Sequence, residues 1–108
     1  MFYVIQTNTS LNNCKEPRDF QSVMYKIEKH TWEEFKEYIL SNSDDFTEKS
    51  INGTMIGHIK PKNCIIENVL INDDKHLEII IKYEVNTQLR VTNIKLCKVS
   101  EYDFLKLL

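Results

Sequence analysis

The chain contains no alanine, and its 108 residues include only two glycines, two prolines and two arginines. The glycines, Gly53 and Gly57, are too few to build a glycine-rich loop that holds a phosphate group. The sequence also lacks the GxSxG, SxxK and HExxH motifs of several hydrolase classes. No set of residues in the sequence therefore argues for an enzyme.

Cysteine is scarce as well, since Cys14, Cys64 and Cys97 lie far apart and form no CxxC pair. An odd number of widely spaced cysteines is typical of free thiols in a reducing compartment. No apolar run approaches the roughly 20 residues that span a bilayer. The apolar N-terminus lacks the basic segment of a signal peptide. We therefore expect a cytoplasmic protein that does not bind membranes.

The remaining composition is globular, with 42% hydrophobic and 28% charged residues. Fourteen basic and 16 acidic residues give a net charge of −2, which argues against direct binding of nucleic acid. Isoleucine, lysine and asparagine are abundant, at 13, 12 and 10 residues. No folding requirement explains this together with the missing alanine, which is the best helix former. AT-rich codons favour these three residues, which suggests an AT-rich bacterium or its phage as the source.

The pattern of apolar residues predicts one α+β domain over residues 1–108, built as a single antiparallel sheet of five to seven strands with two short helices on one face. Alternation predicts that Leu77, Ile79 and Ile81 face the core. Residues 22–29 also fit a helical face, but strand is preferred because a helix start follows at once. Asn52-Gly53 predicts a further hairpin between strands near 46–51 and 54–60. The other strands are expected at 2–7, 22–29, 64–71, 77–85 and from Leu89 onward.

The first helix is expected at 31–41, where Thr31 and Glu34 form a capping box. Its apolar stripe, which we expect to face the sheet, consists of Trp32, Phe35 and Ile39. Its charged side, which we expect to face water, consists of Glu33, Glu34, Lys36 and Glu37.

The second helix is expected at 100–108, with Ser100 as N-cap. We expect it to dock beside the stripe of the first helix and to bury three side chains: Phe104, Leu105 and Leu108. Between the last two strands, a three-residue loop at 86–88 would place Glu84 opposite Arg90. That register also requires a bulge at Thr92-Asn93.

The acidic residues are concentrated in one segment. Residues 28–48 carry a net charge of −5, whereas 1–27 carry +1 and 49–108 carry +2. Acids in the first turn of a helix are favourable, but most of these lie beyond it. We therefore expect six carboxylates to bind a basic partner protein: Glu33, Glu34, Glu37, Asp44, Asp45 and Glu48. The simpler alternative is a solvated helix face and polar loop that bind nothing.

Three classes of function follow from these observations. The leading hypothesis is a small non-catalytic protein-binding module without a cofactor, such as an inhibitor or immunity-type protein that presents its acids to a basic, nucleic-acid-binding protein. A second is a small hydrolase or nuclease that uses His58 or His76 with an aspartate. Residues 73–76 could offer metal ligands, although a polar turn is the simpler interpretation. A third is an oligomer-forming structural protein, suggested by Ile80 on an otherwise polar strand face.

Overall fold

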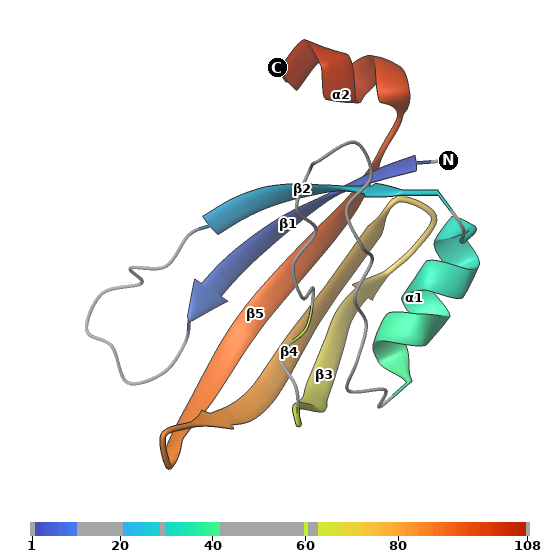
Figure 1. The fold of residues 1–108 in the computed structure, drawn as a ribbon. Coiled ribbons are helices and arrows are strands. Elements are labelled where there is room, and N and C mark those ends of the chain that lie inside the picture. The colour runs from blue at the N-terminus through green and yellow to red at the C-terminus, as the bar shows by residue number, and fades with distance from the viewer. Residues whose placement is uncertain (1, 11–20, 29, 42–59, 61–62, 108) are drawn as a thin grey trace.

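The computed structural model describes residues 2–10, 21–28, 30–41, 60 and 63–107. They form an open antiparallel sheet of five strands in the order β2-β1-β5-β4-β3, with two α-helices (Figure 1). The elements are β1 (Phe2–Ser10), β2 (Gln21–Ile27), α1 (Trp32–Leu40), β3 (Ile65–Asn72), β4 (His76–Val85), β5 (Gln88–Val99) and α2 (Glu101–Leu107). The α+β class and the lower end of the predicted strand count agree with the sequence. The hairpin predicted around Asn52-Gly53 lies outside the described residues.

One face of the sheet packs against α1 and forms the core. The expected alternation in β4 is confirmed, because Leu77, Ile79 and Ile81 are all fully buried. Cross-strand neighbours on β5, Ile94 and Leu96, continue the same layer. Residues 21–27 form a strand, as preferred from the sequence, and also contribute to this core. Of the two described helices, neither has the length or apolar character needed to cross a membrane.

Helix α1 begins as predicted, because the side chain of Thr31 accepts a hydrogen bond from the backbone N–H of Glu34 at 3.2 Å. Trp32 and Phe35 are buried against Phe2 of β1, with edge-to-face ring contacts at 5.9 Å. Such aromatic pairs add about 0.5–1.5 kcal/mol beyond the area they bury. The predicted stripe is therefore the face that fixes α1 to the sheet.

The register predicted for β4 and β5 is wrong. Asn86 and Thr87 form a two-residue turn with φ of 51° and 65°, instead of a three-residue loop. This turn has the positive φ angles of type I′, whose twist matches that of the flanking strands. Tyr83 therefore pairs with Arg90, and Glu84 pairs with Leu89.

No bulge interrupts β5 at Thr92, because the pairing of β4 with β5 is continuous. Thr92 instead takes a buried position on the core face, opposite Ile81. Its hydroxyl lies 3.1 Å from the hydroxyl of Tyr83, so a polar residue is accommodated there by a hydrogen bond.

Helix α2 begins at its predicted N-cap, where the backbone N–H of Asp103 donates to Ser100 Oγ at 3.2 Å. It contacts the sheet through Phe104, which stacks on Tyr3 with ring centroids 4.0 Å apart. Tyr3 follows Phe2 on β1, and successive strand side chains leave opposite faces. Two short helices accompany the sheet, as predicted, and α2 contacts it at Tyr3, beyond the end of β5 in Figure 1. Leu105 is 61% exposed instead of buried.

Candidate binding surface

Three of the six predicted binding carboxylates lie on the solvent side of α1. Glu33, Glu34 and Glu37 are all exposed, and the side chains of Glu33 and Glu34 are 71% and 61% accessible. They extend from a helix whose opposite side is buried in the core. The other three predicted residues, Asp44, Asp45 and Glu48, lie outside the described part of the chain.

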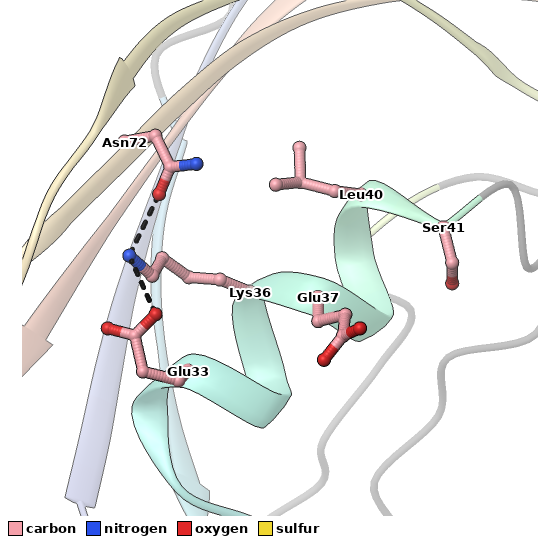
Figure 2. Close-up of a pocket in the computed structure, with 6 residues that line it drawn as sticks. All are labelled: Glu33, Lys36, Glu37, Leu40, Ser41 and Asn72. Atoms are coloured by element: carbon pink, nitrogen blue, oxygen red, sulfur yellow. Dashed lines mark hydrogen bonds and ion pairs between the residues drawn. The ribbon is translucent and has the colours of Figure 1, made fainter.

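Lys36, which was expected to face water, is buried instead. Its Nζ donates at 2.8 Å to both Asn72 Oδ1 and the backbone carbonyl of Asp73, in the β3–β4 connection. The same Nζ lies 3.4 Å from Glu33 Oε2, and Figure 2 shows Glu33 and Asn72 on either side of it. Trp32 Nε1 also donates to the Asp73 carbonyl, at 3.0 Å. A lysine on the charged side of an amphipathic helix gives no sequence signal of burial, so this contact was missed.

The three carboxylates differ in how far nearby positive charge neutralises them. Glu33 shares the Lys36 ammonium with two other acceptors. Glu34 Oε2 lies 3.8 Å from His30 Nδ1, and an imidazole acts as a counter-ion only when it is protonated. Glu37 forms no ion pair with another described residue. The exposed side of α1 therefore keeps negative charge that its own described neighbours do not cancel.

A hollow of about 420 Å³ lies between α1 and the end of β3 (Figure 2). The described residues that line it are Glu33, Lys36, Glu37, Leu40, Ser41 and Asn72. At the C-terminal end of α1, the buried Lys60 donates from Nζ to the carbonyls of Ile39 and Ser41, both at 3.1 Å. A cation at these carbonyls stabilises the C-terminal end of a helix. Both ends of α1 are therefore held by specific hydrogen bonds.

The structure places Asp73 near His76, and this aspartate lies in the predicted turn. Asp73 Oδ1 accepts hydrogen bonds from the backbone N–H groups of Lys75 at 2.9 Å and His76 at 2.8 Å. These bonds hold the pKa of the Asp73 carboxyl below its usual value. His76 Nδ1 is 3.5 Å away, and both side chains are partly exposed. The carboxylate thus closes a turn, as the simpler interpretation predicted. His58 lies outside the described residues.

Both described thiols are at least partly buried. Cys64 is buried, and burial raises the pKa of the Cys97 thiol. A raised pKa disfavours the reactive thiolate. Over the described ranges, no group of three or more His, Cys, Asp or Glu side chains could hold a metal ion.

Comparison with known proteins adds no family: no protein-family model, curated protein or solved structure matches the chain. Any functional argument therefore starts from the charge and geometry described above.

Proposed function

We propose that this protein is a small, non-catalytic, cytoplasmic protein-binding module that presents the acidic side of α1 to a basic surface on a partner protein. The observation that carries this proposal is the division of α1 into two sides. Its apolar side is buried against the sheet, while Glu33, Glu34 and Glu37 are exposed on the other.

Rigid presentation favours binding, because a partner then orders few groups on association. The hydrogen bonds of Thr31, Lys36 and Lys60 hold α1 along its length. Uncompensated carboxylates on such a helix attract basic surfaces from a distance and raise the association rate. The same carboxylates repel phosphate groups, so we do not expect a phosphate-bearing ligand to bind this surface.

The partner class that fits best is a nucleic-acid-binding protein, whose basic groove accepts a negative helix in place of phosphates. Asp44, Asp45 and Glu48 follow α1 in the sequence and would extend the same negative charge. This chemistry is that of an inhibitor or immunity-type protein encoded by a phage or mobile element.

The test begins with capture of the partner from the native host and its identification by mass spectrometry. Binding is then measured for a variant with Glu34→Lys and Glu37→Lys. We expect affinity at low salt to fall about tenfold or more, equivalent to about 1.4 kcal/mol, and its salt dependence to flatten.

The matched control reverses two exposed acids away from α1, with Glu67→Lys on β3 and Glu101→Lys on α2. This variant has the same net charge as the α1 variant, so general attraction changes equally. Equal weakening by both variants, or none by either, would show that α1 is not the binding surface.

A further inference from the structure

We propose a second recognition site at the end of the sheet remote from α1: a groove that receives an arginine side chain of a partner protein. The groove is a hollow of about 500 Å³ between the start of β3 and the hairpin of β4 and β5. Asp73, which contacts α1, precedes β4, whereas Glu84 of the groove lies near its other end. The two surfaces are therefore separated by the length of one strand, and this proposal does not depend on the α1 proposal.

Two aliphatic side chains form walls of the groove. Ile65 of β3 is 64% exposed and Leu89 of β5 is 48% exposed. Ile65 pairs with Lys82 and Leu89 pairs with Glu84. Lys82 and Glu84 are two residues apart on β4, so all four side chains leave the same face of the sheet. Exposed apolar groups gathered around a hollow mark an interaction surface.

The charges of the groove select a cationic occupant. Lys82 Nζ lies 3.3 Å from Glu67 Oε1, so this lysine already has a counter-ion. Glu84 is exposed and forms no ion pair with any other residue that the structure describes. It therefore leaves one carboxylate available beside Leu89. A phosphate or carboxylate ligand would be repelled by both glutamates.

Arginine matches this combination better than other side chains. Its aliphatic stem can lie over Ile65 and Leu89 while the guanidinium reaches Glu84. The planar guanidinium donates two parallel hydrogen bonds to one carboxylate, which the ammonium of lysine cannot do. The site thus fits an arginine next to an apolar residue in an exposed segment of a partner.

The probe is the peptide N-acetyl-Leu-Arg-Leu-amide, titrated into the ¹⁵N-labelled full chain and followed by NMR. We expect the largest amide shifts at Ile65, Glu84 and Leu89. A matched peptide with citrulline, which has nearly the same shape but no charge, should bind at least about fivefold more weakly. Glu84→Gln should weaken the arginine peptide by a similar factor, whereas Glu101→Gln on α2 should leave its affinity unchanged.

Three results would overturn the proposal: equal binding of the arginine and citrulline peptides, unchanged binding to Glu84→Gln, or no shift at these residues. Tyr102 and Leu105 of α2 provide an internal control, because they are equally exposed apolar residues. Shifts of the same size there would show general apolar adhesion. The spectrum of each variant also reports whether it is folded.

Discussion

Lys36 joins α1 to the β3–β4 connection through a single ammonium group. Its Nζ contacts Glu33 on its own helix. The Lys36 side chain is only 7% accessible, so its ammonium is largely removed from water. Burying a charge requires compensation, and here Asn72 Oδ1 and the Asp73 carbonyl provide it. Because Lys36 is buried, the glutamates of α1 determine the charge of its exposed surface.

Replacing Lys36 by glutamate should destabilise the protein strongly. The new carboxylate would face Glu33, an amide oxygen and a carbonyl, none of which donates a hydrogen bond. We expect a loss of about 3 kcal/mol or more in the free energy of unfolding, measured by urea denaturation.

The control is Glu37→Lys, which changes charge by the same amount at the next position on α1. Because Glu37 is exposed, its replacement should change stability by about 0.5 kcal/mol or less. Similar values for the two variants would mean that Lys36 is not buried.

At the scale of elements, the described side chains of α2 reach the sheet through an aromatic contact. Phe104 is half-buried on Tyr3, whereas Leu105 points into solvent. A seven-residue helix is unstable alone, so this contact and the Ser100 cap hold it in place.

Replacing Phe104 and Leu105 separately by alanine should distinguish the docked side chain from the exposed one. Phe104→Ala should reduce the free energy of unfolding by about 1–3 kcal/mol, because it removes the ring stack and its buried area. Leu105→Ala should change it by about 0.5 kcal/mol or less. Thermal or urea unfolding measures both, and an equal loss from Leu105→Ala would contradict the observed docking.

The turn between β4 and β5 contains a residue poorly suited to it. Thr87 is β-branched but adopts φ of 65°, in the left-handed region that costs non-glycine residues roughly 1 kcal/mol. Thr87→Gly should therefore raise the free energy of unfolding by about 0.5–1 kcal/mol.

Gln88→Gly provides the comparison for this turn, because Gln88 is the first residue of β5. Glycine in a strand is unfavourable by about 0.5–1 kcal/mol, so this variant should be less stable than the original chain. Stabilisation by Gln88→Gly but not by Thr87→Gly would indicate the three-residue loop.

At the scale of the whole molecule, the net charge of −2 conceals an uneven distribution. The described surface carries exposed acids on α1 at one end of β4 and Glu84 at the other. Both proposed surfaces favour cationic groups. Both consist of exposed residues and not of the residues buried in the core.

The order of elements was predictable from local patterns in the sequence. Alternation in β4, the capping box at Thr31 and the N-cap at Ser100 each depend on residues within a few positions of one another. Their physical causes are local, so no knowledge of the fold was needed. The exposed positions of Glu33, Glu34 and Glu37 followed from the helical period in the same way.

Contacts between distant segments were decided only by the tertiary structure. Lys36 is buried because the β3–β4 connection meets α1 there, and α2 lies where Tyr3 offers a ring. The groove at Ile65 and Leu89 exists because β3 and β5 flank the same strand. Local sequence sets which backbone forms are favourable, whereas burial and charge pairing depend on which segments the folded chain brings together.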